Sequence, residues 1–339
     1  MANETINRDK NVIIMASLTT KYLGLELNSP LIISSSGLTD NLDKLRLAED
    51  SGAGAVVLKS LFEEQINHQA SLLAESTDYP EASDYVSYYT KSHSLDNYLK
   101  LIVSAKESLN IPVIPSINCI TQEDWISFAA RIEEAGADAL EINVFYLPVD
   151  KNVTPATAEK LYFDLIQKVR KIIKIPIAVK LGQRFSNLLN LVDQIYKRGV
   201  NGVVLFNRFF EPDIDINTMN ISPASVFSTP EDKRYVIRWV AMIDAMIEKI
   251  DIAASTGVHS GEDAVKYLLS GADVVQVCSV LYKNGIEYLK KMNKSISKWM
   301  DQKGFENIES FRGKLNYGSI AEPGKYERAQ FMRYFSAYE

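Results

Sequence analysis

Cysteine and histidine, the residues that build disulfide frameworks and metal centres, are scarce in this chain. The 339 residues include 2 cysteines, Cys119 and Cys278, and 3 histidines that lie far apart. This composition excludes a disulfide scaffold and leaves no cysteine-rich region for an iron–sulfur cluster. We therefore expect two small, buried, free thiols, no bound metal, and a reducing, cytoplasmic location.

Long apolar runs and an excess of positive charge are missing as well. No apolar run approaches the ~20 residues that a membrane-spanning helix needs, and residues 1–14 lack the apolar segment of a secretory signal. The formal net charge of -6 disfavours nucleic acid and acidic membrane surfaces as partners. Hydrophobic residues make up 46% of the chain, enough for a sizeable core.

The chain does contain eight short apolar runs, with helical patterns between most of them. Continuously apolar strands that alternate with helices predict a parallel sheet covered on both faces. Eight such units favour an α/β fold of the (β/α)8 TIM-barrel type, and an open eight-stranded sheet is the alternative. The predicted strands are Leu31–Ser34, Ala55–Leu58, Val113–Ile117, Ala139–Asn143, Ile177–Lys180, Gly202–Phe206, Ile252–Ser255 and Val274–Val277.

Glycines mark the ends of several predicted helices. Gly52, Gly136, Gly199 and Gly271 recur in similar short segments, each before a strand and each where a helix needs a left-handed residue to end. Two connections are unusually long, at 61–91 after the second strand and 209–229 after the sixth. We expect a disordered leader at 1–17, a single barrel domain at 18–315 and a C-terminal tail at 316–339.

Residues 251–282 have the pattern of a strand, a turn, a helix, a second turn and a second strand. Ser260 can cap the helix and Asp263 can complete a capping box. The turns carry Ser255-Thr256-Gly257 and Cys278-Ser279. In a barrel, the loops after strands 7 and 8 commonly hold a phosphate through backbone N–H groups. An ordinary turn packed with small residues is the alternative interpretation.

Polar residues follow the other predicted strands at their carboxyl ends. A lysine that ends a buried strand needs a partner, because a buried ammonium group is costly. Lys59 and Lys180 could instead form structural ion pairs with Glu141 or another barrel carboxylate. Amide side chains present a donor and an acceptor to a planar ring. The combination predicts a site for an anion joined to a planar, polar ligand. The residues are Ser35, Ser36, Gly37, Lys59, Ser60, Asn118, Cys119, Asn143, Tyr146, Lys180, Asn207 and Arg208.

These motifs resemble the dihydroorotate dehydrogenase family of FMN-dependent (β/α)8 barrels, particularly its dihydropyrimidine-dehydrogenase-like branch. The resemblance covers about residues 18–315, nearly the whole chain. It rests on the following segments: Leu27-Asn-Ser-Pro-Leu-Ile-Ile-Ser-Ser-Ser-Gly37, Lys59-Ser60, Pro115-Ser-Ile-Asn-Cys119, Glu141-Ile-Asn143, Ala178-Val-Lys-Leu181, Thr256-Gly257, Ser260-Gly261 and Gln276-Val-Cys-Ser279.

The resemblance implies a role for each of these segments. Backbone groups of 255–257 and 278–279 would hold the FMN phosphate. Lys180 would approach the flavin ring, Lys59 would lie at its edge, and 35–37 would pass close to it. Asn118, Asn143 and Asn207 would face flavin or substrate. The implied reaction converts dihydroorotate to orotate in pyrimidine biosynthesis, with hydride transfer from a C–C bond of a cyclic amide to flavin N5.

The substrate end departs from the family pattern. The family's catalytic Cys or Ser falls on Tyr146 here, or on Leu147 if the gap is placed against Pro148. A phenol with a pKa near ~10 is a better acid than base at neutral pH. The family's Asn-rich substrate loop corresponds to Val86–Ser92, which has no Asn. Arg208 replaces a small hydroxyl residue and could bind a substrate carboxylate or a loop acid such as Asp213. The flavin end therefore looks retained and the substrate end rebuilt.

Two other functions stay open on the sequence alone. A strand-end lysine can be the nucleophile of a Schiff-base aldolase or lyase. A flavin-binding paralogue without dihydroorotate turnover would also fit the missing Cys or Ser. For the main interpretation, the resemblance implies a homodimer, and the chain would pass its electrons to a cluster only through a separate electron-transfer subunit.

Overall fold

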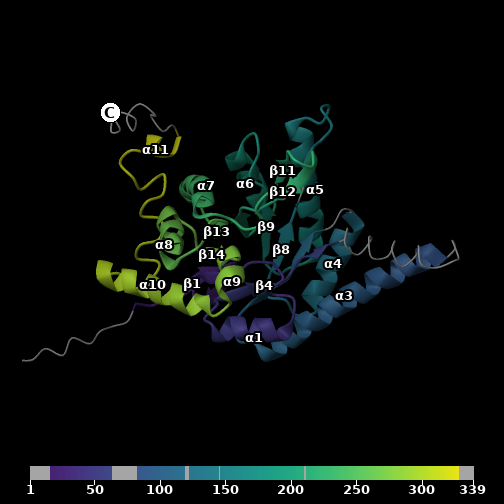
Figure 1. Ribbon diagram of the computed structural model, residues 1–339, viewed down its shortest axis with the longest axis horizontal. Coiled ribbons are helices and arrows are strands. Elements are labelled where there is room, and N and C mark those ends of the chain that lie inside the picture. Colours follow the sequence, from purple (N-terminus) through teal and green to yellow (C-terminus); the bar gives the residue numbers. More distant parts are fainter. Residues whose placement is uncertain (1–15, 63–81, 119–121, 145, 210, 328–339) are drawn as a thin grey trace, which may run out of the picture.

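Parallel strands curl into a barrel at the centre of the molecule, with helices around it (Figure 1). The computed structural model describes residues 16–62, 82–118, 122–144, 146–209 and 211–327. The main sheet has ten segments, in the order β5-β7-β8-β9-β10-β13-β14-β3-β4-β6. They are β3 (Leu31–Ile33), β4 (Ala55–Val57), β5 (Leu61–Phe62), β6 (Val113–Ile114), β7 (Ser116–Asn118), β8 (Leu140–Asn143), β9 (Ile177–Leu181), β10 (Gly202–Leu205), β13 (Asp251–Ser255) and β14 (Val274–Val277).

The barrel closes through two interrupted strands. β4 and β5 are successive parts of one strand, and so are β6 and β7, which Pro115 separates because proline has no N–H to donate. β4 pairs with β6, β5 with β7, and β7 with β8, so the sheet returns to its starting edge. Ten segments thus make eight strands. The predicted (β/α)8 barrel is confirmed and the open sheet is not found.

The helices lie between the barrel strands, as the helical patterns in the sequence predicted. Gly52, Gly136, Gly199 and Gly271 have φ values of 84, 87, 89 and 117°, as the predicted left-handed turns require. The helices are α1 (Leu42–Asp50), α3 (Ala82–Ser108), α4 (Gln122–Glu134), α5 (Pro155–Ile172), α6 (Leu188–Tyr196), η1 (Pro230–Asp232), α7 (Lys233–Met246), α8 (Gly261–Ser270), α9 (Ser279–Asn284), α10 (Tyr288–Lys303) and α11 (Gly324–Glu327).

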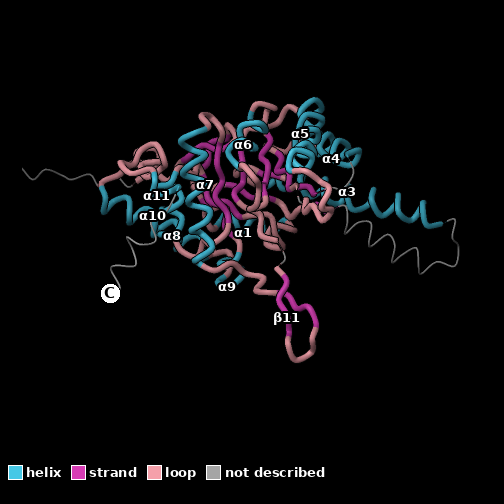
Figure 2. The backbone as a smooth tube through the Cα atoms, turned by 90° about the horizontal axis from the view of Figure 1, so that it is seen from above, coloured by secondary structure: helices cyan, strands magenta, loops and turns pink. Residues whose placement is uncertain are grey.

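Both long connections contain regular structure that the sequence did not indicate. α3 begins at Ala82, inside the predicted loop 61–91, because its helical spacing is masked by polar and aromatic residues. After β10, β11 (Pro212–Asp215) pairs antiparallel with β12 (Asn220–Pro223) to form a hairpin. Figure 2 shows this hairpin projecting from the body of the molecule. No helix in the described ranges is long and apolar enough to cross a membrane.

Side chains alternate between the outside and the inside of the barrel along every strand. One apolar cluster lies between the barrel and its helices, and a second lies inside the barrel. A hairpin of β1 (Thr20–Tyr22) and β2 (Leu25–Leu27) supplies Tyr22, Leu23 and Leu27 to the inner cluster. The inward residues of the strands in this cluster are Ile32, Ala55, Val57, Ile114, Ala139, Ala178, Val204, Ala253 and Val274.

The next inward position on six strands is polar and buried. Each of these residues lies two positions after a member of the inner apolar cluster, so it points inside as well. They are Ser34, Ser116, Glu141, Lys180, Ser255 and Gln276. The barrel interior is therefore apolar at its amino end and polar at its carboxyl end, where barrel enzymes build their sites.

A charge cluster fastens the C-terminal segment to the amino end of the barrel. Nη2 of Arg312 lies 2.8 Å from Oδ1 of Asp244 on α7, and its Nε lies 2.7 Å from Oδ1 of Asp273 before β14. Asn316 donates to the second oxygen of Asp244 at 2.6 Å. Burial raises the pKa of Asp273 to about 7, although Arg312 lowers it. The guanidinium group therefore balances the charge of two partly buried carboxyl groups.

The division into leader, barrel and tail stays a prediction.

Replacing Arg312 by Met should destabilise the fold in a pH-dependent way. The change leaves two partly buried carboxyl groups unpaired, which we expect to lower the free energy of unfolding by about 3 kcal/mol. Removing the cation raises the pKa of Asp273 above its parent value of about 7, so the loss relative to the parent should grow as pH rises through about 7, where the carboxyl group ionises in the parent and stays protonated in the variant. Denaturant unfolding at several pH values measures both effects.

The matched control is Lys21→Met, which removes an ion pair to Glu26 whose side chains are 76% and 72% exposed. Such a pair contributes little, and the variant should unfold like the parent protein. An Arg312→Met variant as stable as the Lys21→Met variant at pH 8 would show that the charge cluster does not support the fold.

Candidate functional site

Inward polar side chains of four strands form one hydrogen-bonded network across the carboxyl end of the barrel. Nε2 of Gln276 on β14 donates to Oε2 of Glu141 on β8 at 2.7 Å, and Oε1 of Gln276 accepts from the Ser34 hydroxyl at 3.0 Å. Nζ of Lys180 on β9 donates to Oγ of Ser34 at 3.3 Å and lies 3.6 Å from Oε1 of Glu141. The network therefore crosses the interior, because β8 and β14 lie on opposite sides of the ring.

Lys180 is the charged member of this network that also reaches the cavity above it. The side chains of Glu141 and Lys180 are 1% and 7% exposed, so each depends on the other for charge balance. Oε1 of Glu141 accepts no hydrogen bond from the described residues. An ammonium group has three N–H donors, and Lys180 lines the cavity with the remaining donor capacity.

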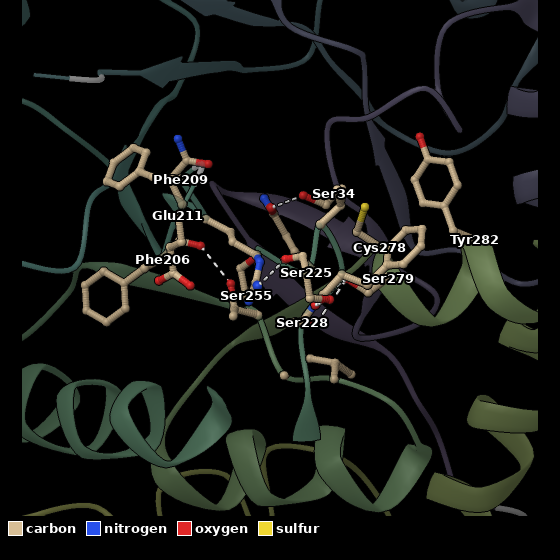
Figure 3. Close-up of a pocket in the computed structure, with 18 of the residues that line it drawn as sticks. Ser34, Phe206, Phe209, Glu211, Ser225, Ser228, Ser255, Cys278, Ser279 and Tyr282 are labelled. Carbon is tan, nitrogen blue, oxygen red and sulfur yellow. Dashed lines mark hydrogen bonds between the residues drawn. The ribbon is translucent and has the colours of Figure 1, made fainter. Parts of the chain in front are cut away.

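A cavity of about 390 Å³ opens at this end of the barrel (Figure 3). The size is that of a small-molecule site. Its walls come from the strand ends and from the loop after β10, which supplies 223–228. Nine of the residues singled out from the sequence line it together: Ser35, Lys180, Asn207, Arg208, Ser255, Thr256, Gly257, Cys278 and Ser279.

The turn after β13 has the tight geometry that was expected of a phosphate turn. Thr256 and Gly257 have φ values of 81 and 73°. A Cβ atom at Gly257 would lie 2.4 Å from the backbone N of Lys233, so no side chain fits there. Ser260 accepts from the N–H of Asp263 at 3.2 Å and caps α8, as predicted. Backbone rather than side chain thus faces the cavity at this turn.

The asparagines and serines near the mouth are also paired with one another. Nδ2 of Asn207 donates to Oδ1 of Asn143 at 2.8 Å, which links the mouth ends of β10 and β8 across the intervening strand β9. The hydroxyl groups of Ser35 and Ser60 lie 2.9 Å apart. A Cβ atom at Gly37 would lie 2.8 Å from the Tyr282 hydroxyl. Only small residues fit beside the first strand end.

The other predicted residues in the described ranges do not line this cavity; they are Ser36, Gly37, Lys59, Ser60, Asn118, Asn143 and Tyr146. Lys59 is exposed after β4, Asn118 ends β7, and Ser36 accepts from the N–H of Leu38 at 3.2 Å. Tyr146 is half-buried and packs against the main apolar cluster. Asn143 touches the cavity wall through Asn207.

Arg208 is bound to the loop that follows β10, though to a different acid from the one considered. Its Nη1 donates to Oδ2 of Asp232 at 2.9 Å, and its Nη2 donates to the carbonyl oxygen of Ser225 at 2.7 Å. Asp213 instead lies in the projecting hairpin. Arg208 therefore fixes the loop over the cavity.

Cys278 is a free cysteine at the end of β14. Burial raises the pKa of its thiol, and Ser36 and Lys180 only partly oppose this effect. A neutral, mostly buried thiol is a packing group rather than a nucleophile.

Cys119 and the side chains of 86–92 lie outside the described residues, as do residues 1–14. Within the described ranges, no group of three acidic, His or Cys residues could hold a metal ion.

Sequence reasoning considered Glu141 only as a structural partner of a lysine, and it missed Gln276, Ser34 and Ser228 as site residues. The strand alternation could have identified Glu141, Gln276 and Ser34, because each lies two positions after an apolar residue that points into the barrel. Ser228 carries no such signal, because it sits in a long connection whose path depends on tertiary contacts. His259, which precedes α8, is half-buried, and its Nε2 lies 3.2 Å from the Ser228 hydroxyl.

Comparison with known proteins identifies the family. A sequence profile described as "Dihydroorotate dehydrogenase" matches residues 17–300. The "Dihydroorotate dehydrogenase B (NAD(+)), catalytic subunit" of Thermoplasma volcanium is 26% identical over 304 residues, covering 88% of this chain and 98% of that protein. The "Dihydroorotate dehydrogenase (fumarate)" of Lachancea kluyveri is 24% identical over 324 residues, covering 89% and 99%.

The profile match includes all eight barrel strands and both turns at the cavity. The family's enzymes are flavoproteins that act as oxidoreductases on a C–C bond. With this match across most of its length, the chain belongs to the dihydroorotate dehydrogenase family.

Proposed function

We propose that the protein is an FMN-dependent oxidoreductase that transfers hydride between a C–C bond of a planar cyclic amide and flavin N5. The observation that carries the proposal is Lys180, a buried lysine with donor capacity at the cavity and a buried carboxylate behind it. An ammonium group so placed suits the polar edge of a flavin ring. The cavity of about 390 Å³ and the turn at Gly257, where no side chain fits, suit the rest of FMN.

Each group of cavity residues has a proposed role toward FMN. Backbone groups of 255–257 and 278–279 would hold the phosphate, and Lys180 would lie at the ring. The segment 35–37 would pass the ring closely, Lys59 would lie at its edge, and Asn118 would lie near it. The paired amides of Asn143 and Asn207 would orient the ring or the substrate. When bound, FMN supplies the acceptor or donor of the hydride.

The chain's own contribution to the reaction is binding, orientation and the movement of one proton. We propose that Tyr146 exchanges that proton with the substrate carbon next to the one that exchanges hydride. Asn143, Asn207 and Arg208 would contact the substrate, with Arg208 acting mainly by fixing the loop. A tyrosine is the better acid than base at neutral pH, which favours reduction of an activated alkene.

Two protein partners are proposed for this chain: a separate electron-transfer subunit and a second copy of the chain. The Thermoplasma volcanium protein is described as a catalytic subunit, which supports a separate electron-transfer subunit for this chain. The hairpin of β11 and β12 exposes apolar side chains that water does not favour, which supports a homodimer. They are Ile214, Ile216, Met219 and Ile221, at 69%, 81%, 86% and 75% exposure.

The first experiment is an anaerobic visible spectrum of the purified protein, incubated with FMN and titrated with dihydroorotate and then with dihydrouracil. We expect a bound flavin whose absorption bleaches with one of the two compounds, which also names the substrate class. A flavin that binds but never bleaches would support a paralogue without dihydroorotate turnover. Failure to bind FMN would overturn the proposal, and borohydride trapping would then test the Schiff-base alternative.

Replacing Tyr146 by Phe tests the proton-transfer role. Loss of a positioned acid typically slows the chemical step by 10²–10⁴-fold, and we expect a loss of about that size in flavin reduction or reoxidation. FMN affinity should not change, because Tyr146 does not line the cavity. Tyr196→Phe on α6 is the matched control, since Tyr196 is also partly buried in the main apolar cluster. A Tyr146→Phe variant with the parent's rate would rule the role out.

Sedimentation velocity tests the proposed homodimer. We expect a dimer for the parent chain and a monomer for the double variant Ile216→Glu, Met219→Glu, because charges would be buried at the interface. Met246→Glu, at an exposed apolar position on α7 away from the hairpin, should remain a dimer. A parent chain that sediments as a monomer at micromolar concentration would contradict the proposal.

A further inference from the structure

Three loops meet at one side of the cavity through hydroxyl and imidazole groups. The Ser228 hydroxyl, after β12, lies 3.1 Å from Oγ of Ser279 and 3.2 Å from Nε2 of His259. The N–H of Ser228 also donates to Oγ of Ser279 at 3.1 Å. Ser228 and Ser279 line the cavity, as Figure 3 shows, whereas His259 is not among the residues that line it. A hydrogen bond from His259 can therefore reach a ligand only through Ser228.

The surroundings of His259 keep its imidazole neutral when no anion is near. Burial lowers the pKa of His259, and the cations Lys283 on α9 and Lys233 on α7 lower it further. The Ser228 contact and Asp263 on α8 oppose this. Asp263 is itself occupied, because its Oδ1 lies 2.9 Å from Nζ of Lys233 and its Oδ2 accepts from the His259 N–H at 3.1 Å. Lys266 lies 3.5 Å from the same carboxylate.

A phosphate group held beside Ser228 and Ser279 would reverse this balance. A nearby dianion favours the charged form of an imidazole. The protonated ring is a donor at both nitrogens, so its Nε2–H can donate to Oγ of Ser228. The proton of the Ser228 hydroxyl is then free to point into the cavity. With a neutral ring whose Nε2 is an acceptor, the Ser228 hydroxyl can donate to that nitrogen, or to Oγ of Ser279 at 3.1 Å, and is not held toward the ligand.

We propose that His259 is a positioning residue that, when protonated, aims the Ser228 hydroxyl at the phosphate of bound FMN, so that FMN binding takes up a proton at this site. The proposal rests on the proposed FMN function. It adds a side-chain contact that discriminates FMN from riboflavin to the backbone contacts of the two turns. It also makes FMN affinity fall as pH rises, since proton uptake becomes harder.

A purely structural role for the same contacts predicts something different. If His259 only tied three loops together, its loss would weaken FMN and riboflavin binding alike and at every pH. Glutamine at 259 can still donate from an amide to Ser228 but cannot titrate. Alanine at 259 can do neither. The two substitutions therefore separate orientation of the hydroxyl group from protonation.

The test measures dissociation constants of FMN and riboflavin between pH 5.5 and 8.5 by quenching of flavin fluorescence. For the parent protein we expect FMN affinity to fall by up to about tenfold per pH unit within part of this range, the limit for one linked proton. Riboflavin affinity should stay level. His259→Gln should bind FMN with a reduced pH slope, and His259→Ala should bind it weakly throughout.

The FMN phosphate has its own ionisation near pH ~6, which all variants share, so the difference in slope isolates His259. His93→Gln on α3 is the matched control and should keep the parent's slope. Calorimetry in two buffers of different ionisation enthalpy should give more protons taken up by the parent than by His259→Gln. Equal slopes for the parent and His259→Gln, or the same slope with riboflavin, would overturn the inference alone. No FMN binding by the parent would overturn the proposed function as well.

Discussion

The buried contact between Lys180 and Glu141 is the interaction on which the site depends. The two charges lie 3.6 Å apart inside the barrel, and each would be costly there without the other. Gln276 and Ser34 hold the remaining polar atoms and connect the pair to the opposite wall. One oxygen of Glu141 and part of the donor capacity of Lys180 are not used within the network. The network therefore holds Lys180 in place and leaves hydrogen-bonding capacity for a ligand.

The same alternation along the strands builds both the fold and the site. Outward residues pack against the helices, and inward residues change from apolar to polar toward the carboxyl end. Ala178 and Lys180 on β9 show the transition within two positions. A barrel needs a packed interior for stability, and the apolar layer with the β1–β2 hairpin provides it. The polar layer above it can then be specialised for a ligand without weakening the closure of the sheet.

Much of this architecture was predictable because it is encoded locally. The apolar runs predicted the strands, the glycines predicted the helix ends, and small residues at 255–257 predicted a tight turn at the cavity. From the sequence, Glu141 could be named only as one possible partner for Lys180 or Lys59, because it becomes the neighbour of Lys180 only when β8 and β9 pair. The hairpin, the early start of α3 and the position of Ser228 depend on contacts between distant segments. The weak apolar periodicity of those segments gave no local signal for them.

Charge balance in the cavity gives the clearest indication of the substrate. Among the described residues that line it, the cations are Lys180 and Arg208, and each is matched by an acid, Glu141 and Asp232. An anionic substrate would therefore have to compete with a carboxylate for its cation. A neutral cyclic amide needs only the donors and acceptors that Asn143 and Asn207 present. Under the proposed function, the pairing of Arg208 with Asp232 would therefore favour an uncharged cyclic amide over one that carries a carboxylate.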